Sequence, residues 1–230
     1  MIGTIINTLL ILLGSFLGLL ISRGIPQRVR DTVMMAMGLS TLLIGLSGAL
    51  KTTDTLCVIV CMGVGSLLGS LLNIEAKLDQ LGHYLEKKLS HSGEAGSIGR
   101  GFVTATLVYC VGAMAIVGSI DSALRGDHST LIAKGVIDGL TAVIFTSSLG
   151  IGVALSAVSV LLYQGAIALL ASLLAPILTE SVILEMSAVG GLLIAAIGLN
   201  LVYDKHIPVG NMLPAIFLPL AYLPLAGLFA

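Results

Sequence analysis

Eight stretches of the chain are almost wholly apolar, and mostly short polar segments separate them. Each stretch runs for roughly 18–23 residues, which is enough for an α-helix to cross a bilayer. Transmembrane strands would instead alternate apolar and polar positions over about ten residues. The pattern therefore predicts an all-α, polytopic transmembrane helix bundle of about eight spans. The predicted spans are Ile2–Ile21, Thr32–Leu50, Thr55–Leu72, Gly101–Ile120, Leu131–Leu149, Gly152–Leu174, Val182–Val202 and Val209–Phe229.

The link between the fifth and sixth predicted spans is very short, running only from Ser147 to Gly152. Either it is a hairpin turn between two helices, which we favour, or one of the segments is a broken or re-entrant helix. Irregular backbone at membrane depth is tolerated only against protein or a water-filled cavity. In the second case Ser147, Ser148, Gly150 and Gly152 would be candidate ligands for a substrate or ion.

The longest connection has a helical pattern of its own, with Leu78, Leu81, Leu85 and Leu89 at helical spacing and charged residues largely on the other side. We expect residues 74–99 to form a cytoplasmic amphipathic helix followed by a flexible linker. It would either extend the third span along the membrane surface or bind a partner. The whole chain, residues 1–230, is then a single membrane domain.

Composition supports the membrane assignment. The chain of 230 residues is 57% hydrophobic and 10% charged, and its mean hydropathy is +1.09. A soluble domain carries about 25% charged residues. A formal net charge of −1 argues against a nucleic-acid-binding surface. The 28 glycines favour helices that pack closely.

Basic residues predict the orientation, because short cytoplasmic loops are enriched in Lys and Arg. The first loop holds three arginines, and the connection Asn73–Arg100 holds four basic residues. The loop Ala175–Met186 holds Glu180 and Glu185 and no base. We therefore expect the first two regions inside and the third outside, with both termini outside.

A faint internal repeat links the second and seventh predicted spans. The run from Gly38 to Leu46 resembles the run from Gly190 to Leu199, with one extra residue. Because the two runs are offset by five helices, the repeats would insert in opposite senses. Inverted-topology repeats are a recurring plan of secondary transporters.

Asp138 is the most informative polar residue, because a carboxylate at a helix centre costs roughly 2.5–3.5 kcal/mol on insertion scales. It stands between the small residues Gly135 and Gly139, four residues after Lys134. One interpretation is an ion pair between Lys134 and Asp138 near the outer surface. Another is a site where Asp138 binds a proton, a cation or a substrate amine, and a third is a packing position without a function.

Other polar residues within spans are weaker candidates. Gln164, in the middle of the sixth span, either joins helices by hydrogen bonds or lines a pathway. Asn7 and Asn200 lie within a turn or two of a membrane face, where capping or interfacial hydration is favoured over ligand binding. We expect Asp121, after the fourth span, among the outer headgroups.

No sequence pattern supports catalysis, because the chain has no HExxH, G-x-S-x-G, P-loop or CxxCH motif. We expect neither an enzyme nor a cofactor. Cys57 and Cys61 share a helix face, but no His or third Cys lies near them in sequence, so we expect no metal site there.

Several motifs together resemble the YqgA/YdfK-like family of uncharacterised bacterial inner-membrane proteins. They are Gly3–Asn7, Cys110–Ile120 followed by Gly126-Asp127, Lys134–Gly139, and Ser147–Val153 with Tyr163-Gln164-Gly165 beyond. The resemblance covers essentially the whole chain. It implies a protein of the bacterial cytoplasmic membrane and brings no established activity.

Two classes of function fit these features. The first is a transporter or channel for a small solute or ion, with Asp138 as ligand and neutral groups from Gln164, Asn7 and the Ser147–Gly152 link. The second is a non-transporting scaffold or regulatory subunit. The expected partners are the lipid bilayer, a small solute or ion, and further copies of the chain, since Gly14/Gly18 and Gly65/Gly69 have the spacing of helix-pairing motifs.

Overall fold

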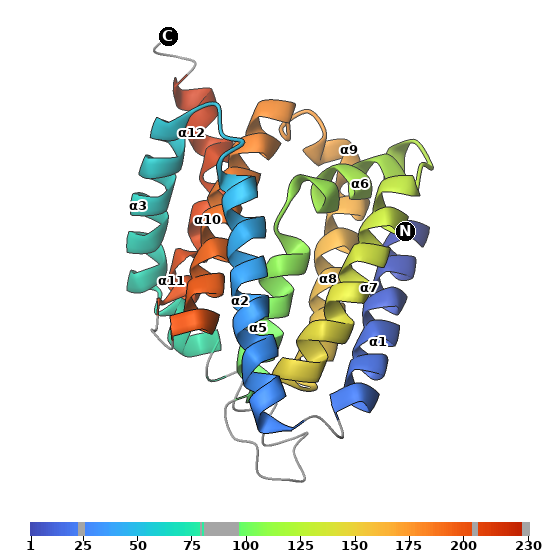
Figure 1. The fold of residues 1–230 in the computed structure, drawn as a ribbon. Helices are drawn as coiled ribbons and strands as arrows, with labels where there is room; N and C mark the ends of the chain where they lie inside the picture. Colours follow the sequence, from blue (N-terminus) through green and yellow to red (C-terminus); the bar gives the residue numbers. More distant parts are fainter. Residues whose placement is uncertain (23–25, 79, 81–96, 204–206, 227–230) are drawn as a thin grey trace. The chain divides into compact units, whose positions relative to one another are not determined.

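The computed structural model of the protein describes residues 1–22, 26–78, 80, 97–203 and 207–226. Every regular element in these ranges is helical, which confirms the predicted all-α class (Figure 1). The chain divides into two compact units. The first combines residues 1–37, 78–110 and 114–171, and the second combines residues 38–77, 111–113 and 172–230.

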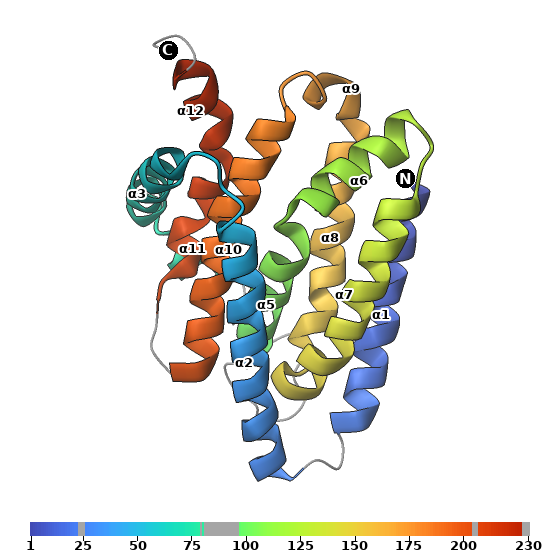
Figure 2. The ribbon, with the colours of Figure 1, turned by 45° about the horizontal axis from the view of Figure 1, so that its top comes forward.

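The first unit is built on four long helices and one shorter helix. They are α1 (Ile2–Ser22), α5 (Ser97–Cys110), α6 (Ala113–Leu124), α7 (Ser129–Leu149) and α8 (Gly152–Leu169), and the first part of α2 (Gln27–Ala49) also belongs here. In both ribbon views α1 lies along α7 (Figures 1 and 2). The two helices run in the same direction, because Gly3 lies against Leu131 and Gly18 lies against Val143.

The second unit contains the rest of α2 and the C-terminal helices. They are α3 (Thr55–Leu71), α10 (Glu180–Tyr203), α11 (Val209–Met212), the 3₁₀ helix η1 (Leu213–Phe217) and α12 (Pro219–Ala226). The short helix α9 (Ala171–Leu174) lies where the chain passes from the first unit to the second. α3 packs against α11 and η1, with Gly69 against Asn211 and Gly65 against Ala215.

The helices agree well with the predicted spans. Five described helices are long and apolar enough to cross a membrane, and two bent pairs raise the number to seven. The bent pairs are α5 with α6, and α11–η1 with α12. The remaining predicted span is α3, whose 17 residues stand at the lower limit for a spanning helix.

The link from Ser147 to Gly152 is a tight turn, which confirms the favoured hairpin. α7 ends at Leu149, Gly150 adopts φ = 79°, and α8 begins at Gly152. This left-handed backbone is open to glycine at no steric cost. The N–H of Gly150 donates to the carbonyl of Thr146 and caps α7.

Glu185 is not in a loop, as the sequence interpretation had it, but inside α10, where its side chain is buried. Its carboxylate accepts hydrogen bonds from the hydroxyl and N–H of Thr53, at 3.2 and 2.9 Å, and from the N–H of Asp54 at 3.1 Å. The hydroxyl of Thr52 donates to it at 2.5 Å. Glu185 therefore fastens the turn that precedes α3 to α10.

The glycine runs singled out as a repeat lie against each other. Gly38 faces Gly198, and Gly45 faces Gly191 and Ala195, so α2 and α10 cross in opposite directions at these positions. An added methyl group at Gly45 or Gly191 would collide with backbone of the other helix. This is the pairing that an inverted repeat would give these two segments.

The glycine pairs from which a homo-oligomer was expected are used inside the chain. Gly14 and Gly18 pack on α7, whereas Gly65 and Gly69 pack on η1 and α11. Their spacing therefore no longer argues for self-association, and an oligomer stays a prediction. Most of the expected cytoplasmic helix and linker at 74–99 lies outside the described residues, although residues 74–78 are helical.

Candidate functional site

The candidate site lies where α1 meets α7. Small residues bring the two backbones together: a Cβ added at Gly14 would collide with the carbonyl of Gly139, and one at Gly135 would lie 3.0 Å from the Cα of Asn7. Such contacts allow helices to approach closely in a membrane. Asn7, on α1, is thereby placed next to the turn of α7 that carries Lys134 and Asp138.

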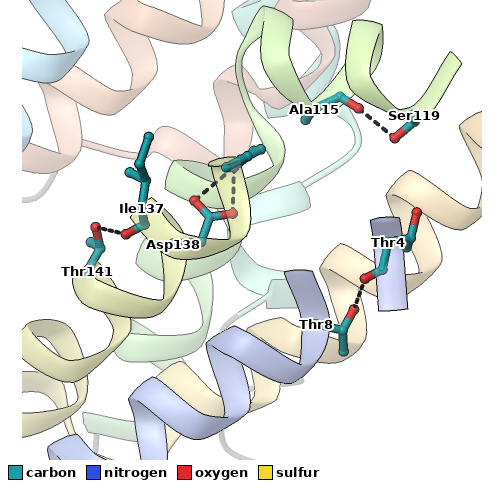
Figure 3. Close-up of polar contacts among 8 residues, drawn as sticks. Thr4, Thr8, Ala115, Ser119, Ile137, Asp138 and Thr141 are labelled. Atoms are coloured by element: carbon teal, nitrogen blue, oxygen red, sulfur yellow. Dashed lines mark hydrogen bonds and ion pairs between the residues drawn. The ribbon is translucent and has the colours of Figure 1, made fainter. Parts of the chain in front are cut away.

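Lys134 and Asp138 form an ion pair that is buried inside the first unit. The lysine Nζ lies 2.8 Å from Oδ1 and 2.6 Å from Oδ2 of the aspartate (Figure 3). The two side chains are only 8% and 5% exposed. The predicted ion pair is therefore present, and both of its side chains are buried inside the protein. Low dielectric strengthens the attraction and raises the cost of separating the charges.

Helix α5 ends close to this pair. α5 ends at Cys110, Gly112 adopts φ = 131°, and α6 starts at Ala113 with its axis turned by 61° (Figure 2). Cys110 is close enough to Lys134 and Asp138 for electrostatic interaction, and Tyr109 is close enough to Asp138. A break leaves backbone groups without the usual helical partners, and broken helices commonly form transporter binding sites.

Unpartnered polar atoms gather in the same unit. Both amide atoms of Gln164 and the hydroxyl of Tyr109 are fully buried and form no hydrogen bond with any described residue. The Asn7 amide, also fully buried, has the Asp138 carboxylate within interaction range. By contrast, Thr8 and Ser119 each donate to a carbonyl of their own helix (Figure 3). Native proteins leave few buried polar groups unsatisfied, and each exception calls for an explanation such as water, an ion or a function.

The side chain of Asn7 was expected to be capping or hydrated near a membrane face, but it is buried in the interior of the protein. Its side chain lies close enough to the Asp138 carboxylate to interact with it. Gln164 is at a comparable depth, because it follows Gly150 by 14 residues and Asp138 precedes Gly150 by 12. At 1.5 Å per residue these levels differ by about 3 Å. Asn7, Gln164 and Asp138 are the predicted site residues that occupy this layer.

The other predicted site residues lie elsewhere. Ser147, Ser148, Gly150 and Gly152 are at the hairpin end of α7 and α8. Ser147 is nine residues from Asp138, which corresponds to about 13–14 Å along a helix. The Ser147 hydroxyl donates to the carbonyl of Ile144, and Gly152 packs against the backbone of Ile98. Their arrangement suits a helix turn.

Two further polar residues lie outside the site. Asp121 forms a partly exposed ion pair with Arg125 at 3.0 Å. Asn200 exchanges two hydrogen bonds with the backbone of Ile207, of 2.8 and 2.9 Å, and so secures the connection after α10. This capping role agrees with the interpretation favoured from the sequence.

Sequence reasoning missed Tyr109 and Cys110 as members of the site. Tyr109 is fully buried, and its ring stacks on Phe145 at a centroid distance of 6.5 Å. The sequence signal nearest to them is Gly112, two residues after Cys110, and it is one of several small or polar residues in this segment. The site thus offers a carboxylate, an ammonium group, amide oxygens and a phenol in a setting shielded from solvent.

Comparisons with known proteins agree with this architecture. The family described as "Protein of unknown function (DUF554)" matches residues 2–223. The chain is 31% identical over 223 residues to "Uncharacterized membrane protein YdfK" of Bacillus subtilis (strain 168), covering 95% of this chain and 94% of that protein. It is 35% identical over 224 residues to "Uncharacterized protein YqgA" of Escherichia coli (strain K12), covering 94% of each. No solved structure matches the chain significantly.

These similarities confirm the family resemblance seen in the motifs, and a membrane location agrees with the apolar helices. The chain is a membrane protein and belongs to the family described as protein of unknown function (DUF554).

Proposed function

We propose that the protein carries a small ion or solute across the bacterial cytoplasmic membrane, with Asp138 as the ligand inside the first unit. The observation that carries the proposal is the buried Lys134–Asp138 pair, with the end of α5 at Cys110 within electrostatic range of it. Intramembrane charges are expensive and commonly mark ion or substrate pathways. A purely structural helix bundle has no need of such a pair.

The unpartnered polar atoms support the same proposal. An amide such as that of Gln164, buried without a hydrogen bond to the described residues, costs free energy unless water or a ligand satisfies it. A pathway that holds water or solute in the transport cycle supplies that partner. A scaffold gains nothing from keeping these groups unsatisfied.

A native cysteine offers a test that does not need the solute to be known. Cys110 is partly exposed and lies beside the ion pair. We would replace Cys57 and Cys61 by alanine, leaving Cys110 as the sole thiol of the three in the chain. A water-soluble, membrane-impermeant methanethiosulfonate reagent should then label Cys110 from at least one side of sealed vesicles.

The matched control keeps Cys57 as the sole thiol, which is fully buried in α3. It should stay unlabelled under the same conditions. Labelling of Cys110 alone supports a hydrated pathway that reaches the pair. Equal resistance of both thiols, in protein shown to be folded, would favour the scaffold or regulatory subunit.

We also infer that both termini lie outside the cytoplasm. The basic loops and an arrangement of eight spans support this orientation. In an eight-span chain the first and fifth spans must run in the same direction, as α1 and α7 do. A periplasmic reporter enzyme fused to either terminus should be active. A homo-oligomer stays our prediction, and light scattering of the detergent-solubilised protein checks it.

A further inference from the structure

Lys134 holds the position that a bound cation would take. Its ammonium group contacts both oxygens of Asp138, at 2.8 and 2.6 Å. Among the described residues, Glu185 is the only other buried side chain of the Asp, Glu, Lys or Arg type, and it belongs to the second unit. The pair is therefore electrically neutral as it stands, and the carboxylate is already occupied by a cation of the protein's own.

Charge balance decides what happens when a second cation arrives. A cation on Asp138, with Lys134 still charged, would leave a net positive charge in the interior. Such an uncompensated buried charge is strongly unfavourable. A lysine can escape this state by releasing a proton, whereas an arginine cannot.

Few other groups could supply the balancing charge. Tyr109 and Cys110 of α5 lie within electrostatic range of the pair, and Tyr163 of α8 lies within range of Cys110. Helix α1 brings the neutral amide of Asn7 and has no ionisable side chain in its span. A tyrosinate or thiolate formed here would add a second negative charge next to Asp138, so Lys134 is the favoured proton donor.

The neutral groups suit a hard, singly charged cation. Such cations prefer oxygen ligands, and the amide oxygen of Asn7 and the Tyr109 hydroxyl are fully buried and free of hydrogen bonds to the described residues. A divalent cation would call for more carboxylates than the single one present, since Ca²⁺ commonly takes several oxygen ligands with Asp and Glu among them.

We infer that a monovalent cation exchanges with one proton at this site: the cation binds Asp138 and Lys134 changes from ammonium to amine. In the step, Lys–NH₃⁺···⁻OOC–Asp plus M⁺ gives Lys–NH₂, M⁺···⁻OOC–Asp and H⁺, so atoms and charge balance. The inference rests on the proposed role of Asp138 as ligand and adds the cation class and the coupling to protons.

Proton release from the full-length, detergent-purified protein tests the exchange. LiCl, NaCl and KCl are added in turn to weakly buffered protein, with choline chloride as the control, and released protons are counted with a pH indicator. We expect about one proton per bound cation for at least one salt, because the site must stay neutral. Asp138→Asn should release none.

Two further readouts identify the donor. Lys134→Arg keeps a permanent charge and should neither bind the cation nor release a proton. Infrared difference spectra report protonated carboxyl groups directly through their C=O band. In the wild type Asp138 is already ionised, so cation binding should cause no change in this band. In Lys134→Met, Asp138 has lost its counter-ion and should be protonated, so cation binding should remove the band.

Each contrary result has a distinct meaning. The inference would be overturned if Lys134→Arg exchanged cations for protons as well as the wild type does. It would also be overturned if cation binding removed a protonated-carboxyl band in the wild type. Either result would show that Lys134 is not the proton donor. Folded wild-type protein that binds none of the three cations would overturn it as well. Asp138-dependent transport of another solute would leave the proposed function standing in those cases. Proton exchange without transport would leave this inference standing alone.

Discussion

Breaking the buried ion pair should destabilise the first unit strongly. Asp138→Asn keeps the size of the side chain but leaves the Lys134 ammonium without a counter-ion. Removing one partner of a buried pair costs about 3–5 kcal/mol. A ceiling of similar size comes from the free energy a lysine needs to give up its proton at pH 7, about 4–5 kcal/mol. With side chains only 8% and 5% exposed, little solvent screening reduces this cost.

Two controls separate the ion pair from the substitution itself. Asp121→Asn makes the same change in another i, i+4 pair, whose partner Arg125 is 77% exposed, and it should cost about 0–1 kcal/mol. Lys134→Met combined with Asp138→Leu removes both charges, and such replacements are often neutral or stabilising.

The assay is reversible unfolding in mixed micelles followed by circular dichroism, with the free energy of unfolding extrapolated to zero denaturant. We expect Asp138→Asn to lose several times more stability than Asp121→Asn, and the double variant to recover most of the loss. Equal losses for the two aspartates would refute the reasoning, because the Lys134–Asp138 pair would then be as hydrated as a surface pair.

Three more predictions concern packing, capping and pH. Gly14→Leu should lower the free energy of unfolding by about 1–3 kcal/mol or more, because it overpacks the α1–α7 contact. Gly165→Ala should leave the free energy of unfolding nearly unchanged, because a Cβ there would have only one atom nearby, at 3.9 Å. Glu185→Leu should cost about 1–3 kcal/mol, because the partly buried donors of Thr52–Asp54 lose their acceptor. Glu185→Gln keeps one acceptor and should cost less in the same assay. The hydrogen bonds from Ser129 hold the pKa of Asp127 below its ordinary value; that stability is present above the unfolded pKa, about 3.9, and is lost as the pH falls through the folded pKa, so the melting-temperature difference between wild type and Asp127→Ala should vanish in acid.

The membrane bundle could be predicted from the chain because apolar runs of spanning length have few other outcomes. The Lys134–Asp138 pair could also be predicted, since four-residue spacing places two side chains on one helix face. The burial of the polar side chains could not be predicted. Asn7 is fully buried because Gly135 and Gly139 admit α1 closely to α7, and that pairing joins segments far apart in sequence.

Glu185 shows the same limit from another side. Its carboxylate binds backbone and hydroxyl groups of Thr52–Asp54, more than 130 positions earlier in the chain. As a sequence feature it reads as an acidic residue near a loop, where charge counting for orientation gave it its only role. Tyr109 and Cys110 were passed over because a helix break at one glycine, Gly112, leaves no trace in hydropathy.

The most direct test of the central claim is the current that solute gradients drive through proteoliposomes on a solid-supported membrane. Lithium, sodium and potassium gradients and small zwitterionic metabolites are applied to the wild type, Asp138→Asn and Asp121→Asn. Cation-for-proton exchange in a one-to-one ratio moves no net charge, so a pH dye inside the vesicles is read alongside the current. The account predicts a solute-dependent signal, in either the current or the pH dye, that persists in Asp121→Asn and disappears in Asp138→Asn. Two results would contradict it: a signal of undiminished size in folded Asp138→Asn, or no current and no pH change with the folded wild type.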